Sequence, residues 1–266
     1  MKKIGFIGVG NMGSAIIRGM AVRDDVEIHG TDLNAEVIAT LENEYGLKAQ
    51  PDAKALAEAV DYVVLAVKPQ HASKVLESIS PALGPDKCLV SICAGLTVDT
   101  LREMSGQECP VVRIMPNTPA MVGEGVFAIC LDDEQLSDES KSFIPEIFDG
   151  LGLVKVLSEK QFDAFTAVIG SGPAYVFYFM EALMEAGVNL GLTRQESTEM
   201  VEALFSGSSR LAKESDHHVS QLREMVSSPA GTTIKALLHL DRTATRGNIV
   251  DAVTESYLRS IELGSK

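Results

Sequence analysis

The first residues that could do chemistry form a glycine-rich segment near the amino terminus. The string GVGNMG at residues 8–13 follows a short apolar run and opens a helical pattern over residues 11–21. In that context Gly8 permits a tight turn, Gly10 lets backbone amides approach a pyrophosphate, and Gly13 lets the helix lie close to the strand. The N-terminus of the helix attracts phosphates. The segment therefore predicts a dinucleotide site whose contacts are Gly8, Gly10, Asn11, Met12 and Gly13.

An acidic residue stands where such a site meets the adenosine ribose. Asp32 ends the second predicted strand, 19 residues beyond Gly13. A carboxylate there accepts hydrogen bonds from a ribose 2′-hydroxyl and repels a 2′-phosphate. Residues 31–36 contain no lysine or arginine that could pair with a phosphate, so the segment favours NADH. The alternative is that Asp32 only caps the helix that follows it.

Three further segments stand where predicted strands end, at the sheet edge where ligands of doubly wound folds bind. Residues 66–69 read AVKP, residues 91–95 read SICAG, and residues 113–120 contain two prolines that stiffen a loop suited to one side of a nicotinamide pocket. Taken alone, the lysine of the first segment is better explained as a solvated side chain. The cofactor contacts expected in these segments are Ala66, Val67, Lys68, Pro69, Ala94, Gly95 and Asn117.

A second segment rich in glycine and hydroxyl groups lies far along the chain. Residues 227–234 read SSPAGTTI and come just before a helical pattern. Backbone amides exposed at such a helix entrance bind anions, and a carboxylate is a natural ligand. The residues by themselves leave an ordinary Ser/Thr capping loop open as the alternative.

The elements that position these segments alternate between strand and helix as far as residue 159. Short apolar runs predict strands at residues 26–30, 62–67, 88–93 and 110–115, with helical spacing between them, and the last strands are expected at residues 126–131 and 152–157. This alternation is typical of a parallel sheet with crossover helices. The sequence thus predicts an α/β Rossmann-type dinucleotide-binding domain over residues 1–159.

Only long helical patterns follow, so an all-helical C-terminal domain is expected over residues 160–266. Gly172-Pro173 suits a helix start, and Thr193 with Glu196 forms a capping box for the next helix. The helix over residues 175–186 is apolar on nearly every face and must be surrounded by protein. In so small a domain a second subunit provides that cover most easily, which predicts a homodimer.

Composition limits the partners that the chain can have. Its 23 basic and 37 acidic side chains give a formal net charge of −14, which would repel nucleic acid and anionic membrane surfaces. The cysteines show no metal-binding or redox spacing, so we expect buried free thiols and no metal site. No signal-peptide or membrane-spanning pattern is recognised, so a cytoplasmic location is expected. The cysteines are Cys88, Cys93, Cys109 and Cys130.

Five segments resemble, in order and separation, the motifs of the pyrroline-5-carboxylate reductase family. They are residues 8–12, 66–69, 115–120, 170–175 and 227–234, which together cover almost the whole chain. The last is the family's signature, with Ala230 in place of the usual glycine, a change that should leave the anion-binding loop intact. The resemblance implies reduction of 1-pyrroline-5-carboxylate to L-proline with NADPH or NADH. It also implies a dimer built through the helical domain, often assembled into larger rings.

The resemblance assigns roles in the second segment. Ser228, Gly231 and Thr232 are expected to cradle the substrate carboxylate, and the Thr233 hydroxyl is expected to be the catalytic group that hydrogen-bonds the ring nitrogen. A protonated imine accepts hydride directly, so no histidine is needed as an acid or base. The histidines near and after this segment are expected at the surface or in packing; they are His217, His218 and His239.

Three alternatives remain for the function. A reductase of another cyclic imine would keep the same fold and cofactor. A β-hydroxyacid dehydrogenase-like enzyme shares the two-domain plan but uses a lysine on the interdomain helix, and residues 175–186 contain none. A non-catalytic NAD(P) sensor would need no carboxylate cradle, which argues against it.

Overall fold

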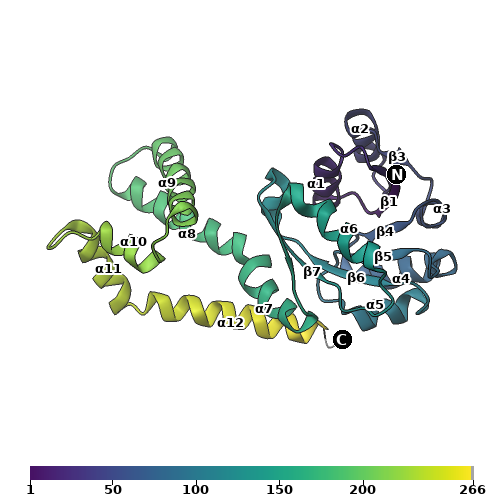
Figure 1. The fold of residues 1–266 in the computed structure, drawn as a ribbon. Coiled ribbons are helices and arrows are strands. Elements are labelled where there is room, and N and C mark those ends of the chain that lie inside the picture. Colours follow the sequence, from purple (N-terminus) through teal and green to yellow (C-terminus); the bar gives the residue numbers. More distant parts are fainter. Residues whose placement is uncertain (265–266) are drawn as a thin grey trace. The chain divides into compact units, whose positions relative to one another are not determined.

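A computed structural model describes residues 1–264 of the chain (Figure 1). It divides into two compact units. The α/β unit comprises Met1–Ser171 and the residues from Tyr257 onward, and the helical unit comprises Gly172–Ser256.

The α/β unit is built on one sheet of eight strands with the order β3-β2-β1-β4-β5-β6-β7-β8. The chain runs from β1 outward to β3, then returns to the other side of β1 to begin β4. The strand order therefore reverses between β1 and β4, which creates the crevice where doubly wound folds bind nucleotides. The strands are β1 (Lys2–Ile7), β2 (Val26–Thr31), β3 (Lys48–Ala49), β4 (Tyr62–Leu65), β5 (Cys88–Ser91), β6 (Val111–Met115), β7 (Gly125–Cys130) and β8 (Gly152–Val156).

Two strands depart from the all-parallel arrangement expected from the sequence. β7 runs antiparallel to β6, and β8 is parallel to β7, so both run opposite to β1–β6. Only nine residues separate Met115 from Gly125, and they form a 3₁₀ turn at Thr118–Val122. A parallel connection needs a crossover of a dozen or more residues, so this link is long enough only for a reversal.

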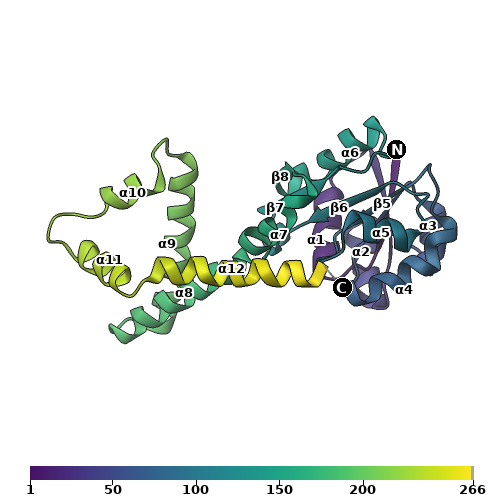
Figure 2. The same cartoon turned by 90° about the horizontal axis from the view of Figure 1, so that it is seen from below.

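Helices cover both faces of the sheet, and each face has its own apolar core (Figures 1 and 2). On one face lie α1 (Asn11–Met20), α2 (Ala35–Tyr45) and α6 (Asp138–Phe148); on the other lie α3 (Ala53–Ala59), α4 (Pro69–Ile79), α5 (Val98–Ser105) and α7 (Phe162–Phe165). β3, α3 and α6 were not predicted from the sequence, and the helical pattern at Ser73–Ile79 predicts a start of α4 four residues later than the structure has it. Pro69 is instead the first residue of α4, a position where proline loses no needed donor.

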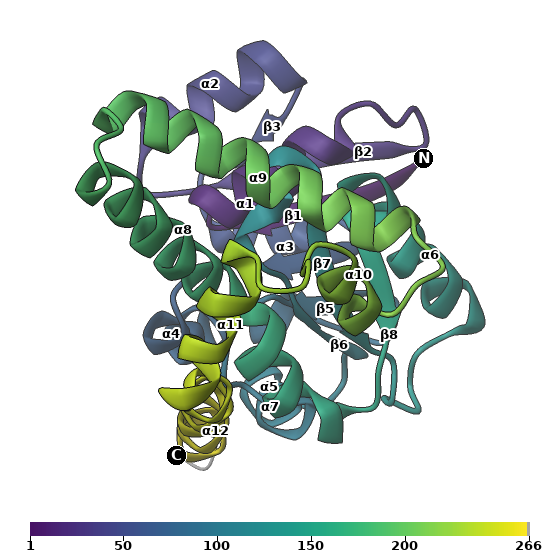
Figure 3. The same ribbon diagram turned by 90° about the vertical axis from the view of Figure 1, so that its left-hand side faces the viewer.

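The helical unit has little interior of its own. It contains α8 (Gly172–Asn189), α9 (Arg194–Glu214), α10 (Val219–Met225), α11 (Thr232–Arg242) and the first part of α12 (Thr245–Gly264). Helices α8 and α9 pack against each other (Figure 3), and the capping box of Thr193 and Glu196 begins α9 as predicted. No residue of α8 is buried in the single chain, so the buried helix expected over residues 175–186 is exposed there. A helix this apolar needs cover from outside the chain.

The division between the units lies later than the boundary expected at residue 159. Residues 159–171 group with the α/β unit because Phe162 and Phe165 of α7 are buried in the core of that unit. The last turns of α12 group with it too, since Ser260 bonds to Asp163 at 2.6 Å. The strand pattern does stop near residue 159, but packing carries the first turns of the following helix back onto the sheet.

Candidate cofactor and substrate sites

The sheet aligns the strand ends after which the predicted cofactor segments begin. Ile7 of β1 is paired with Thr31 of β2 and with Leu65 of β4, and Leu65 is paired with Ser91 of β5. These four residues end their strands in one row. The loops that begin at residues 8, 32, 66 and 92 therefore leave the sheet side by side, at the carboxyl edge expected for a ligand site.

The glycine-rich turn has the geometry that its sequence predicts. Gly8 has φ +93°, and a Cβ placed on it would lie 2.8 Å from the Ala66 carbonyl oxygen. A Cβ on Gly13 would lie 2.6 Å from the Gly8 oxygen, so the helix could not approach the strand with any larger residue. A Cβ on Gly10 would meet nothing within 4 Å. The turn is therefore closed against protein at Gly8 and Gly13 and open at Gly10, where a phosphate would lie.

The start of α1 presents backbone donors to this open side. Gly10 is the N-cap of α1 and supplies no side-chain capping bond. The amides of Asn11, Met12 and Gly13 in the first turn have no carbonyl partner within the helix, and the helix dipole adds positive potential there. The Ser14 hydroxyl donates to the Val9 oxygen at 2.5 Å and fixes the turn. A cavity of about 190 Å³ lies beside the turn, and its lining includes Val9, Gly10, Asn11, Val37 and Met121.

Asp32 is held by two backbone amides. One carboxylate oxygen accepts from the Val9 amide at 2.7 Å and the other accepts from the Asn34 amide at 2.9 Å. Asn34, and not Asp32, is the N-cap of α2, so the capping alternative is wrong. Each carboxylate oxygen keeps a second lone pair, so Asp32 can still accept from a ribose hydroxyl.

The loops after β4 and β5 are joined by a buried thiol. The Cys93 sulfur donates to the oxygens of Val67 at 3.2 Å and Leu65 at 3.6 Å, and burial raises the pKa of this thiol to about 11. Lys68 is exposed at the N-cap of α4, and within residues 1–264 no bond to its ammonium is seen. Its side chain is therefore available to a ligand. A lysine that only faces solvent would have the same exposed position.

Asn117 makes its visible bonds inside the protein. This side chain is only 8% exposed; its oxygen accepts from the Val126 amide at 2.8 Å and its nitrogen donates to the Ile169 oxygen at 3.3 Å. The bonds tie the loop after β6 to the start of β7 and to a π-helical turn at Thr166–Gly170. The Asn117 side chain therefore fixes the shape of this loop, and its expected contact with the cofactor stays a prediction.

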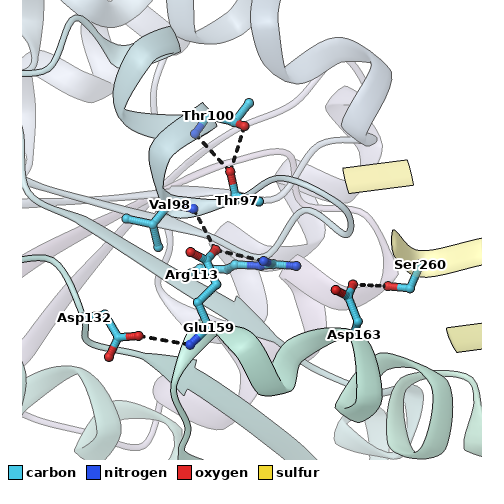
Figure 4. A network of polar contacts seen from close by, with 8 residues as sticks. All are labelled: Thr97, Val98, Thr100, Arg113, Asp132, Glu159, Asp163 and Ser260. Carbon is cyan, nitrogen blue, oxygen red and sulfur yellow. Dashed lines mark hydrogen bonds and ion pairs between the residues drawn. The ribbon is translucent and has the colours of Figure 1, made fainter. Parts of the chain in front are cut away.

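A polar network that was not predicted from the sequence connects β6, the start of α5 and Glu159 (Figure 4). Arg113 of β6 is 6% exposed, donates to Glu159 at 2.9 Å and lies 4.7 Å from the centre of the Phe162 ring. The same Glu159 oxygen accepts from the Val98 amide at the start of α5, at 2.8 Å. Only a charge in the middle of an apolar strand could have signalled this network from the sequence.

The second predicted segment opens α11. Gly231 is the N-cap, its amide donates to the Ser228 oxygen at 3.1 Å, and a Cβ on it would lie 2.4 Å from the Ser228 hydroxyl oxygen. Ala230 has φ +59°, a left-handed conformation that explains the family's usual glycine.

Thr232 and Thr233 are the first two residues of this helix, so their amides have no partner within it. Among the described residues, no hydrogen bond involves the side chains of Ser228, Thr232 or Thr233. The loop is therefore a cluster of free donors at a helix N-terminus. The nearby histidines are exposed as expected, and His218 caps α10.

Comparison with known proteins places these features in one family. Residues 159–263 match the family model described as "Pyrroline-5-carboxylate reductase dimerisation", and residues 3–95 match "NADP oxidoreductase coenzyme F420-dependent". The chain is 35% identical to pyrroline-5-carboxylate reductase of Escherichia coli K12, with 98% of both chains covered. It is 36% identical to the enzyme of that name from Corynebacterium melassecola, with 99% of both covered.

A solved structure is similar over the same length. The crystal structure of Plasmodium falciparum pyrroline carboxylate reductase with NADP bound matches with a TM-score of 0.89 and 35% identity, covering 99% of this chain and 98% of that one. An imine reductase of Streptomyces aurantiacus shares the fold, with a TM-score of 0.59 at 16% identity. The chain belongs to the pyrroline-5-carboxylate reductase family.

Proposed function

We propose that this chain reduces 1-pyrroline-5-carboxylate to L-proline by hydride transfer from NAD(P)H, the last step of proline biosynthesis. The observation that carries the proposal is the family similarity, which extends over 98% of the chain. Both segments that the reaction needs present free backbone amides at a helix N-terminus, one at α1 and one at α11. Such termini bind the phosphates of a dinucleotide and the carboxylate of a substrate.

The residues of the α11 loop suit an imine substrate. The amides of Gly231 and Thr232, together with Ser228, hold the carboxylate, and the Thr233 hydroxyl accepts a hydrogen bond from the protonated ring nitrogen. A protonated imine already carries the proton that the product amine retains, so hydride addition to its carbon completes the reduction without a further acid or base. The nicotinamide supplies that hydride when it is bound.

The glycine-rich turn and Asp32 form the binding site for the cofactor in this proposal. The open face at Gly10 accommodates the pyrophosphate, and Lys68, Ala94 and Gly95 border the nicotinamide end. Because two amides fix its carboxylate, Asp32 cannot move away from a 2′-phosphate without losing both bonds. We therefore propose that NADH is used at least as well as NADPH, although the Plasmodium structure contains NADP.

The exposed apolar helices are covered by a second copy of the chain. Phe177 and Tyr178 of α8 are 62% and 71% exposed, which a water-facing helix does not tolerate. By length and composition Glu159–Asn189 could also cross a membrane, but its first turns are fixed in the α/β core through Phe162 and the Arg113–Glu159 pair. The proposal is a cytoplasmic homodimer, which a ring of dimers could extend, with no nucleic-acid or membrane partner.

The test follows the oxidation of NADH and NADPH by the purified chain with 1-pyrroline-5-carboxylate, other cyclic imines and a set of keto acids. The proposal predicts turnover with 1-pyrroline-5-carboxylate well above every other compound. Preferential turnover of a hydroxy or keto acid would favour the dehydrogenase alternative. Tight cofactor binding without turnover of any compound would favour the sensor.

A further inference from the structure

The loop after β5, residues 93–98, contacts both chain segments that connect the α/β unit to the helical unit. One segment begins at Glu159 and leads into α8, and the other is the end of α12, from Tyr257 onward. All the contacts described below lie within the α/β unit.

The outgoing segment holds the loop through a charged network. Glu159 accepts from the Val98 amide at 2.8 Å and from Arg113 at 2.9 Å. The Glu159 amide donates to Asp132 at 3.0 Å, so the carboxylate is fixed from its backbone as well (Figure 4). Because Arg113 is buried, its pairing with Glu159 is costly to break. The far end of the loop is therefore anchored to the first turn of this segment.

The returning segment holds the loop through α12. The Ser260 hydroxyl is 8% exposed and donates to Asp163 of α7 at 2.6 Å, which docks the last turns of α12 beside α7 (Figures 1, 2 and 4). One turn later, Leu263 comes close to Gly95: a Cβ placed on Gly95 would lie 3.6 Å from the Leu263 Cβ and 3.9 Å from its carbonyl oxygen. Gly95 has φ +79°, so this contact falls on the bend of the loop.

The near end of the loop joins the cofactor edge of the sheet. The Cys93 sulfur donates to the Val67 oxygen, and the Cys93 amide donates to the Ser91 hydroxyl at 3.2 Å. The same short loop therefore contacts the strand ends on one side and both connecting segments on the other. A shift of either connection moves Ala94 and Gly95 relative to the turn at Gly8.

We propose that the end of α12 positions this loop for the nicotinamide cofactor, with Leu263 and Ser260 as positioning residues. Leu263 limits the space open to Gly95 through its Cβ and backbone, and Ser260 holds Leu263 there through Asp163. The inference rests on the proposed function, because it takes Ala94 and Gly95 to border the cofactor. It adds that the helix following the substrate loop also controls cofactor affinity.

Leu263→Gly tests the proposal because it removes the Cβ that lies nearest Gly95, and Leu258→Gly is the matched control. Leu258 lies on the same helix and is 47% exposed against 49% for Leu263, so both changes remove the same side chain from positions of similar exposure. The dissociation constant of NADH is measured by fluorescence titration without substrate. We expect Leu263→Gly and Ser260→Ala to raise it about threefold to tenfold, with Leu258→Gly within about twofold of the unchanged chain. Hydrogen exchange of the amides in residues 93–98 should accelerate in the first two variants only.

Unchanged NADH binding and unchanged exchange in both folded variants would overturn the proposal. An equal effect of Leu258→Gly would also overturn it, because the effect would then belong to the helix as a whole. A positioning role further requires that KM for 1-pyrroline-5-carboxylate changes less than the NADH dissociation constant. If the unchanged chain binds NADH but does not reduce 1-pyrroline-5-carboxylate, the proposed function fails while the binding test keeps its meaning.

Discussion

Replacement of Thr233 by alanine separates a catalytic role from a structural one, because the two roles predict opposite results. Thr233 is the second residue of α11, the N-cap is Gly231, and within residues 1–264 the hydroxyl has no hydrogen-bond partner. Removing it therefore breaks no bond of the fold. Alanine is also the better helix former, by about 0.5 kcal/mol, so stability should stay unchanged or rise slightly.

The kinetic effect should be much larger. If the hydroxyl accepts the hydrogen bond of the protonated ring nitrogen, its loss costs about 1 to 3 kcal/mol of transition-state stabilisation. That corresponds to a fall in kcat/KM of roughly tenfold to a hundredfold. Thr233→Ser keeps the hydroxyl and should recover most of the rate. NADH binding should be unaffected, because the glycine-rich turn belongs to the other unit.

Steady-state kinetics, an NADH titration and a thermal melt on the same preparations provide the measurements. Thr198→Ala is a suitable control, since it removes an exposed hydroxyl from α9 of the same unit. A Thr233→Ala variant with normal kcat/KM would remove Thr233 from the site. A lowered melting temperature with normal kinetics would show that the hydroxyl stabilises the fold through a bond absent from the single chain.

Four further outcomes are expected. The ratio of kcat/KM for NADH to that for NADPH should be at least one and should fall in Asp32→Ala, whereas a preference for NADPH of more than about tenfold would contradict the assigned role. Light scattering should give a dimer or a multiple of it at micromolar concentration, and Phe177→Asp should cause aggregation or unfolding; a well-behaved monomer would contradict the dimer. A thiol reagent at pH 8 should leave the four buried cysteines of the native chain unmodified and label all of them after unfolding, because burial raises the pKa of each thiol. Hydrogen bonds, first from Lys48 and then from His29, lower the pKa of the Glu27 carboxyl from 4.5 to about 2. The ionised carboxylate therefore stabilises the folded chain fully above pH 4.5, and this stabilisation is lost as the pH falls toward 2. Lys48→Met should reduce the acid dependence of the melting temperature, measured in thermal melts over this pH range.

Local sequence was sufficient to predict the glycine-rich turn and the strand ends around it. Gly8 and Gly13 have roles that depend on backbone contacts a few residues away or on the adjacent strand, and short apolar runs and period-3.6 patterns located the strands and helices between them. The loop at α11 was predictable for the same reason, since Gly231 and the following threonines act through the backbone of one helix turn.

Long-range packing decided several features of the fold that no local pattern predicts. The reversal of β7 depends on the short link after β6, and the place where the units divide depends on Phe162 and Phe165 entering the core. The Asn117 side chain accepts from the Val126 amide and donates to the Ile169 oxygen, which lie 9 and 52 residues away. The Glu159 carboxylate likewise meets Val98 and Arg113 across 61 and 46 residues.

The sequence by itself therefore determined which segments form glycine-containing turns at the start of a helix and present backbone amides there, because these features depend on local backbone conformation. Tertiary structure decided how those segments are held. It fixed Asp32 between two amides, turned Asn117 inward, and brought the two connecting segments to the loop at Gly95. Such contacts join residues far apart in the chain. Which residues meet is decided by burial and by the requirement that buried polar groups form hydrogen bonds, and a local sequence pattern contains no information on either.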